Sequence, residues 1–504
     1  MRRATFVALA ALVAGSSSVQ AQDAAHPMAT PPERLGTVHF ATSCSPGVKP
    51  QFDRAVALLH SFEFGASIRG FNEVLATDST CAMAYWGLAL SRWGNPMAAG
   101  NRAPPLLQQG GQWASTGARL ASTDRERGYL GAVSQLYENF AQRDQRTRVD
   151  AYSRAMGALS LEQPADTEAK IFYAISLVAA ASPTDKTYAN QLKAGAILEA
   201  LWAKQPNHPG LAHYIIHTYD YPALANKARA AAAQYAVIAP SAAHALHMPS
   251  HTFTRVGMWK ESVAANERSS EVALNNGSIG EALHAADYEM YAYLQLGDYA
   301  HAKSILDKLP AIAARFDPNA ITGAAPPAAA YFALAAIPAR WALERGAWAE
   351  AAALETRTTD YPYADAITHF ARAIGASHTG DLGEVKASID SLSAIQQRLT
   401  LSKESYWAEQ VAIQQLGARA WLELAQGNKD NALKLMTEAT TREDATEKSA
   451  VTPGPLAPAH ELLGDMLMKL GRPTQARAEY ELTLKKEPNR RHSLIQLGQR
   501  VASG

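Results

Sequence analysis

The feature that most constrains the fold is a helical pattern that continues along almost the whole chain. Ala, Leu, Glu, Gln and Arg dominate, and the alternation of Val, Ile and Thr that is typical of strands is nearly absent. Like residues also recur 34 positions apart in three pairs, Pro206 and Pro240, His213 and His247, and His217 and His251. A fixed period of this length indicates a repeat array in which each helical unit packs on its neighbours. We therefore expect an all-α fold.

The segment 457–490 shows the repeat most clearly. It carries small residues at Gly464 and Ala476 and a large one at Tyr480. This pattern resembles the tetratricopeptide repeat, a helix-turn-helix of about 34 residues in which small residues let two helices approach closely. Weaker copies share a loop glycine before the second helix, at Gly257, Gly297, Gly346, Gly380 and Gly427. We expect a tetratricopeptide-like superhelix, an α-solenoid, over 37–504, with inserted loops near 94–123 and 316–327.

Two stretches resemble a particular protein family. The run CAMAYWGLA over 81–89, followed by WGNP over 93–96, and the run HMPSH over 247–251 are similar to exported bacterial proteins with tetratricopeptide repeats. The resemblance covers most of the chain after the N-terminal segment and implies the repeat fold. That family has no settled activity, so the resemblance implies no function.

The N-terminus has the pattern of an export signal. Arg2 and Arg3 precede an apolar run over 4–15, and the small residue Ala21 closes a cleavage pattern. The run is shorter than the ~20 residues that a membrane-spanning helix needs. We expect a cleaved signal peptide over 1–21, a flexible leader over 22–36, no membrane span, and export to the periplasm or the medium.

Charge and cysteine content exclude several classes of protein. The 47 Lys and Arg balance 47 Asp and Glu, and no basic run is present, which argues against a nucleic-acid partner. Two cysteines are too few for a zinc site of four thiolates. In an oxidising compartment we expect Cys44 and Cys81 to form a disulfide that holds the N-terminal segment on the first helices. Two free thiols are the alternative, because the sequence does not show that the two residues are close.

Histidine is concentrated in one part of the chain. Seven of the 15 histidines lie between His208 and His284. In the repeat register, equivalent positions of three successive units carry His, Asp or Tyr, and these positions share one helix face. Neighbouring helices pack ~8–10 Å apart, so their side chains can reach one ion. We expect a transition-metal site in the concave groove, centred on His213, His217, His247 and His251, with His244, His284 and Asp287 as further ligands or supporting groups.

The ligand types limit the metal and leave the chemistry open. Imidazole-rich ligation without thiolate suits Zn, Cu or Fe. Asp220, Arg255 and Tyr291 fall at groove-lining positions, and any catalysis would need Asp220, Asp287 or Tyr291. Tyr214 follows His213 at the position where an H-E-x-x-H motif has its catalytic Glu, so that motif is missing. The alternative to a metal site is a non-enzymatic scaffold that binds a peptide or a protein partner along the groove.

Pro249 complicates the predicted site. It lies between His247 and His251, inside a predicted helix, where proline removes a backbone hydrogen bond. Either the helix begins near Pro249, which would move His244 and His247 off the shared face, or the helix tolerates a kink.

Overall fold

We describe a computed structural model of the chain, in which Met1, residues 33–98 and residues 101–501 are placed. These residues form α-helices and two 3-10 helices, and none of them forms a strand. The predicted signal peptide and most of the predicted leader lie outside the described residues. No described helix combines the length and the apolar character that crossing a bilayer requires.

The first group of helices encloses an apolar core that extends from Leu35 to Met248. Phe40, Phe52 and Trp86 lie at its centre and are fully buried. The elements are η1 (Pro46–Val48), α1 (Lys49–His60), α2 (Phe64–Thr77), α3 (Ala82–Trp93), α4 (Pro104–Leu120), α5 (Asp124–Gln135), α6 (Gln145–Glu162), α7 (Thr167–Ala179), α8 (Ala189–Trp202), α9 (Pro209–Thr218), η2 (Ala225–Ala228), α10 (Arg229–Ile238), α11 (Ala243–His247) and α12 (Pro249–Arg255).

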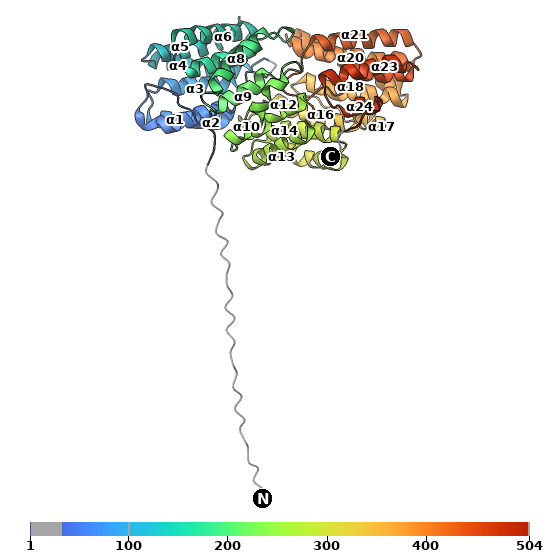
Figure 1. Cartoon of the computed structure of the whole chain (residues 1–504), viewed down its shortest axis with the longest axis horizontal. Coiled ribbons are helices and arrows are strands. Elements are labelled where there is room, and N and C mark those ends of the chain that lie inside the picture. The colour runs from blue at the N-terminus through green and yellow to red at the C-terminus, as the bar shows by residue number, and fades with distance from the viewer. Residues whose placement is uncertain (2–32, 99–100, 502–504) are drawn as a thin grey trace. The chain divides into compact units, whose positions relative to one another are not determined.

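A second group surrounds the long helix α14. It consists of α13 (Trp259–Asn275), α14 (Ile279–Leu296), α15 (Tyr299–Ala313) and α16 (Pro327–Leu343). Every residue of α14 is buried, because α11, α13, α15, α16 and α24 all pack against it. In Figure 1, the green to yellow helices α9 to α14 lie between the blue N-terminal and the red C-terminal helices. Polar side chains on α14 must therefore find their partners inside the protein.

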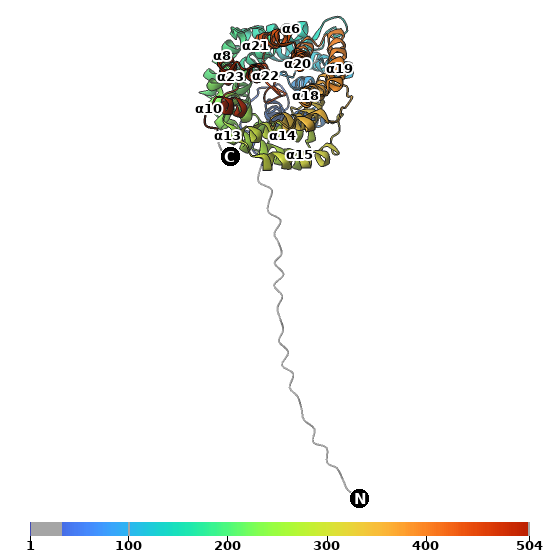
Figure 2. The ribbon, with the colours of Figure 1, turned by 90° about the vertical axis from the view of Figure 1, so that its right-hand side faces the viewer.

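The third group forms the C-terminal core, from Ala328 to Tyr480. Together with α16 it comprises α17 (Trp348–Ala352), α18 (Pro362–Thr379), α19 (Leu382–Leu401), α20 (Ser405–Ala425), α21 (Lys429–Ala445), α22 (Ala459–Lys469), α23 (Pro473–Lys486) and α24 (Arg491–Gln496). Figure 2, in which the right-hand side of Figure 1 faces the viewer, shows α18, α20 and α22 of this group.

Most consecutive helices pack against each other, as α13 does on α14, α18 on α19 and α20 on α21. Gly297 and Gly380 end α14 and α18 in the left-handed conformation, with φ of 74° and 87°, which glycine adopts without steric cost. The other predicted loop glycines, and Gly471 of the last unit, also have positive φ. The all-α, tetratricopeptide-like solenoid predicted from the sequence is confirmed.

Segments far apart in the sequence contact each other within this body. Lys186 Nζ, between α7 and α8, lies 2.7 Å from Glu447 Oε1, and the Tyr288 hydroxyl of α14 donates a hydrogen bond of 3.1 Å to the carbonyl of Ala450. The non-helical residues 446–458, between α21 and α22, thereby contact both earlier groups. We call residues 446–458 the covering segment, because they close over the site described below.

Two sequence expectations about loops and linkers were wrong in part. Residues 94–123 are not a long inserted loop, because α4 fills most of that range. A Cβ on Gly110 would come within 2.3 Å of Tyr137, so this glycine marks close helix packing rather than a turn. The end of the predicted flexible leader is bound to the body, where Arg34 N donates to Ser241 Oγ at 2.8 Å. Residues 314–326, between α15 and α16, contain no helix.

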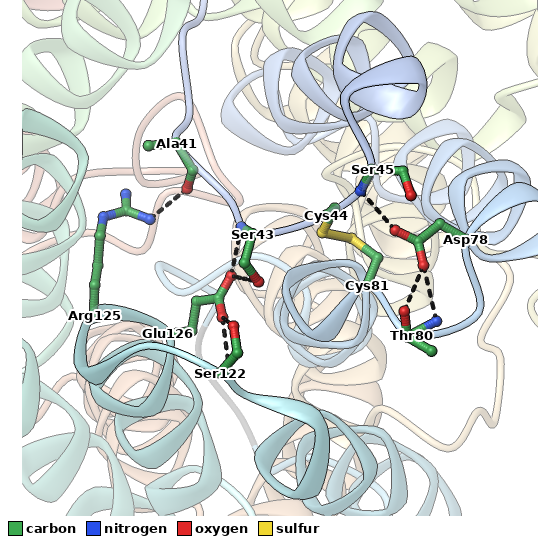
Figure 3. Close-up of a disulfide and its surroundings, with 10 residues drawn as sticks. All are labelled: Ala41, Ser43, Cys44, Ser45, Asp78, Thr80, Cys81, Ser122, Arg125 and Glu126. Carbon is green, nitrogen blue, oxygen red and sulfur yellow. Dashed lines mark hydrogen bonds between the residues drawn. A yellow bond between two sulfur atoms is a disulfide. The ribbon is translucent and has the colours of Figure 1, made fainter.

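Cys44 and Cys81 form a disulfide with a Cα–Cα distance of 4.7 Å (Figure 3). The residues on either side of Cys44 are held independently. Ser43 N donates to Glu126 Oε1 on α5 at 2.9 Å, and Ser45 N donates to Asp78 Oδ2 at 2.8 Å. The disulfide therefore fastens an extended N-terminal segment to the start of α3.

Removing this disulfide should destabilise the protein, because the unfolded chain without the bond has more conformational entropy. The bond closes a loop with a sequence separation of 37. Loop-closure entropy alone gives an upper estimate of about 4 kcal/mol for a loop of this size. We expect Cys44→Ser/Cys81→Ser to lower the free energy of unfolding by about 2–4 kcal/mol in urea titrations, and a reductant should shift the wild type but not the variant. Two reactive thiols in denatured wild-type protein from an oxidising compartment would contradict the bond.

Gly464 tests the packing of the last repeat. A Cβ at this position on α22 would lie 2.6 Å from the Tyr480 ring on α23. Gly464→Leu should therefore separate the two helices and lower the free energy of unfolding by about 1–3 kcal/mol. Gly131→Leu is the matched control, because a Cβ added to Gly131 on α5 would meet no atom within 4 Å, so this variant should not lose stability. Equal unfolding curves for Gly464→Leu and the wild type would contradict the proposed close approach.

Candidate metal centre

Six of the predicted metal ligands meet in one place. His213 and His217 come from α9, His244 and His247 from α11, His251 from α12 and His284 from α14. Their exposed fractions lie between 0% and 6%. The cluster is therefore buried, and residues 324–326 together with residues 449–451 of the covering segment line the cavity beside it.

The six histidines form two adjacent groups rather than one four-histidine centre. Each residue of His213, His217 and His244 offers a ring nitrogen within 4.8 Å of the others, and the same holds for His247, His251 and His284. We call the first group triad A and the second triad B. The rings of His244 and His247, one from each triad, have centroids 5.9 Å apart. The arrangement thus offers two neighbouring positions for a cation.

Pro249 divides the predicted helix without separating the ligands. It is the first residue of α12, where its missing N–H costs no helical hydrogen bond. Met248, between α11 and α12, stays in the right-handed helical region with φ −54° and ψ −35°. His247 and His251 therefore remain on one face, and their Nε2 atoms lie 3.0 Å apart.

The hydrogen bonds of His247 and His251 determine which ring nitrogen carries the hydrogen. His251 Nδ1 lies 3.0 Å from Asp220 Oδ2, and His247 Nδ1 lies 2.6 Å from Asn266 Oδ1. The amide of Asn266 is oriented by its Nδ2, which donates to the carbonyl of Ser262 at 2.7 Å. Both partners can only accept, so each Nδ1 donates. In the neutral rings each Nε2 then carries a lone pair instead of a hydrogen, and the two lone pairs face each other.

Other ring nitrogens in the cluster are buried without a hydrogen-bond partner. His213 Nδ1 donates to the carbonyl of His60 at 2.6 Å, which leaves its Nε2 as an acceptor. Among the described residues, His213 Nε2, His217 Nε2, His244 Nε2 and His284 Nδ1 have no partner. An unsatisfied buried polar group costs ~1–3 kcal/mol. The cluster is therefore costly as a purely structural element.

Burial keeps the imidazoles in the form that binds metals. Burial lowers the pKa of His251 to about 4 and the pKa of His284 to about 3, so both rings are neutral at pH 7. Burial acts to raise the pKa of Asp220, but the charges of Lys448 and Arg255 hold it well below its ordinary value. Asp220 is thus an anion that orients His251. A carboxylate hydrogen-bonded to the far nitrogen of a ligating histidine is common in metal sites.

Two predicted site residues lie elsewhere. Asp287 does not join the histidine cluster. Its Oδ1 instead accepts a 2.7 Å hydrogen bond from Arg340 Nε in a fully buried ion pair. Tyr291 does not line an open groove. It is fully buried, and its hydroxyl lies 3.1 Å from Arg490 Nη1 and 3.3 Å from Glu487 Oε2. Both positions follow the repeat register, but basic side chains distant in sequence occupy the space beside them.

A third buried group has the residue types of a metal site, but Glu168 pairs with both of its histidines, which leaves only His208 Nδ1 of this group without a partner. Glu168 places one carboxylate oxygen 3.0 Å from His60 Nε2 and the other 3.0 Å from His208 Nε2. Each contact pairs a ring N–H with a carboxylate oxygen, so donor meets acceptor. The Tyr214 hydroxyl lies 3.1 Å from His60 Nδ1. We interpret this group as a hydrogen-bonded support for the His60 carbonyl, which in turn orients His213.

Two neighbouring spaces adjoin the triads. A cavity of about 30 Å³ is lined by His217, His244, His251 and His284 together with mostly apolar residues. A larger cleft of about 360 Å³ lies beside it and is lined by Asp220, Tyr406 and Lys448. His217 and the covering-segment residue Ala450 line both. Arg255, which pairs with Asp220, lines a third pocket next to the covering segment.

Several residues that shape the site carried no signal in the sequence. Asn266 lies on the outer helix of its repeat unit, and His60 acts through its backbone carbonyl from 153 residues before His213. Lys448 belongs to the covering segment, and the hydroxyl of Tyr288 on α14 donates to the carbonyl groups of Ala450 and Thr452 in that segment. The spacing of His247 and His251 was the one indication in the sequence. Two ligating histidines need hydrogen-bond partners that orient their rings, but the spacing does not identify these partners.

Comparisons with known proteins show similarity only at the level of helical-repeat architecture. No protein-family model matches the chain, and no curated protein matches it. Among solved structures, the chain is similar to yeast Tom70, with 11% identity over 90% of this chain and 94% of that one and a TM-score of 0.34. It is also similar to the human IFIT1 dimer with PPP-AAAA (13% identity, 78% and 72% covered, TM-score 0.30) and to the TPR domain of P58(IPK) (10%, 90% and 96%, 0.22).

Proposed function

We propose that this helical-repeat protein binds two transition-metal ions, one at triad A and one at triad B. The observation that carries the proposal is the pair of lone pairs on His247 Nε2 and His251 Nε2, 3.0 Å apart. Two acceptors at this distance repel each other unless a cation lies between them. Two nitrogens bound to one ion at ~2.0–2.1 Å in tetrahedral geometry lie about 3.3 Å apart, which is close to the separation here.

The buried nitrogens of triad A support the same function. Three unpaired Nε2 atoms, on His213, His217 and His244, lie inside the protein. A bound ion would satisfy all three at once, whereas a peptide in an open groove could not reach them. The low exposure of the triads thus favours a metal over the alternative, a scaffold that binds a partner through these histidines. Zn, Cu and Fe all suit imidazole ligands.

We also propose that the protein is exported. The Cys44–Cys81 disulfide is of the kind that persists in oxidising compartments. The predicted signal peptide lies outside the described residues and remains a prediction. An N-terminus near Gln22 in protein recovered from the periplasm or the medium is the expected result.

Elemental analysis of the purified protein tests the metal site directly. We expect two equivalents of a transition metal per chain, and a chelator should lower the melting temperature, because an ion bound only by the folded state stabilises it. If no metal copurifies and none of Zn, Cu, Fe or Ni can be reconstituted, the metal function fails. The remaining candidate is then a scaffold for a peptide or protein partner.

A further inference from the structure

The ligand set limits the charge that the site can hold. The two triads supply neutral imidazoles, with no thiolate or carboxylate among their ligand atoms. The nearest acids compensate only part of a large positive charge. Asp220 is already paired with Arg255 and Lys448, which leaves the buried carboxylate of Glu281, whose Oε2 lies 3.5 Å from His244 Nδ1. Burying two divalent ions in such surroundings is expensive, so monovalent ions are favoured.

Copper is the one metal of the imidazole-binding group with a stable monovalent form, and three nitrogen donors suit it. Three ligands leave a coordination position open at each ion. The cavity beside the triads reaches residues of both, since His217 and His244 belong to triad A and His251 and His284 to triad B. Its volume of about 30 Å³ is enough for a molecule the size of water or a diatomic gas.

The rest of the cavity wall is mostly apolar. Ala324, Ala328, Ala329 and Val451 line it together with Tyr363 and Trp407, and Asn95 and Ser449 add polar groups. None of these side chains carries a charge, so the cavity favours a small neutral molecule over an ion. The neighbouring cleft shares Ala450 in the covering segment with the cavity, and it is the side from which such a molecule would reach the histidines.

From these features we propose that triads A and B hold a pair of cuprous ions and that this pair binds dioxygen in the cavity. The inference rests on the proposed metal function and adds the metal, its oxidation state and the ligand. On binding, each cuprous ion gives up one electron and dioxygen accepts two, so that it is held as peroxide between two cupric ions. No proton or further reductant is needed for this step.

Anaerobic loading of the full chain with cuprous ion tests the inference. We expect two copper ions per chain and, on admission of dioxygen, uptake of one molecule per copper pair. The two oxidised ions should couple through the bound peroxide, so electron paramagnetic resonance should detect almost no cupric signal although chemical assay finds two cupric ions. Release of the copper in acid should restore the full signal.

The possible outcomes separate this inference from the metal function. Two bound copper ions with no dioxygen uptake, or with the full resonance signal of two isolated cupric ions, would overturn the dioxygen inference and leave metal binding intact. Binding of zinc or iron with exclusion of copper would have the same consequence. Failure to bind any metal would overturn both.

A cavity-filling variant adds a test that leaves the ligands in place. Val451→Phe extends the side chain toward the cavity of about 30 Å³, so we expect unchanged copper content and at least a tenfold slower dioxygen uptake. Val237→Phe is the matched control, because Val237 is exposed on the surface and does not line the cavity. Equal uptake rates for wild type and a folded, copper-loaded Val451→Phe variant would place dioxygen elsewhere and contradict the inference.

Discussion

Replacing His247 by alanine is expected to remove the ion at triad B, weaken the ion at triad A and abolish most of the response of the protein to chelator. His247 occupies the centre of the cluster, with its ring centroid 4.5 Å from His284, 4.9 Å from His251 and 5.9 Å from His244. An ion bound to the folded state alone contributes ~2.7 kcal/mol at a hundredfold excess over its dissociation constant. Melting curves with and without chelator, together with metal content, measure the effect.

The difference between the two melting curves is the quantity that matters. His247→Ala also leaves a small cavity and removes one of the two donors to Asn266 Oδ1, so the variant loses stability for reasons unrelated to metal. The chelator-dependent part of the stability isolates the ion. A wild-type melting curve that does not respond to chelator or to added metal would contradict the prediction.

His208→Ala is the matched control for a buried histidine outside the triads. His208 is only 2% exposed and pairs with Glu168, so its removal should destabilise the protein. Because both carboxylate oxygens of Glu168 already pair with ring N–H groups of His60 and His208, metal content and chelator response should stay at the wild-type level. His301→Ala, at a site with 64% exposure of the side chain, should change none of these quantities. Loss of metal in His208→Ala would show that the third group also binds an ion.

The repeat register was sufficient to bring the six histidines together but not to show how they divide. The 34-residue spacing relates His213 and His217 on α9 to His247 on α11 and His251 on α12, and the structure places these pairs in adjacent triads. The division into two triads also depends on His244 and His284, which join different groups. Asn266 and Asp220 fix the ring orientations of His247 and His251, and no periodicity in the sequence specifies such contacts.

Burial of the site was not predictable for a similar reason. A solenoid inferred from its repeats has an open concave face, and the covering segment belongs to no repeat. Its position depends on single contacts with distant helices, such as that between Lys186 and Glu447, and on Tyr406, whose hydroxyl donates to the Glu447 carbonyl at 2.9 Å. The glycine-rich composition of 94–123 led to a wrong prediction of a loop. In α4, Gly110 instead lets the helix pack closely on Tyr137.

The largest loss of stability from a single charge change is expected at Asp287, the predicted ligand that the structure places elsewhere. Asp287 and Arg340 are both fully inaccessible to solvent. Asp287→Asn removes the charge with almost no change in shape and leaves the Arg340 guanidinium unpaired in the interior. Breaking a buried ion pair in this way typically costs about 3–5 kcal/mol, and we expect a loss in that range. Urea unfolding of variant and wild type measures it.

The double variant Asp287→Asn/Arg340→Gln shows whether the loss comes from the unpaired charge. With both charges removed, part of the stability should return, although Arg340 also donates to Thr452 Oγ1 at 2.8 Å and to the Gly454 carbonyl at 3.0 Å in the covering segment. The two residues should therefore be coupled by about 0.5–3 kcal/mol in a double-mutant cycle. Metal content of the folded Asp287→Asn protein should equal that of the wild type, because the carboxylate points to Arg340 and not to the triads. A selective loss of metal without loss of stability would instead make Asp287 a ligand, as the repeat register alone suggests.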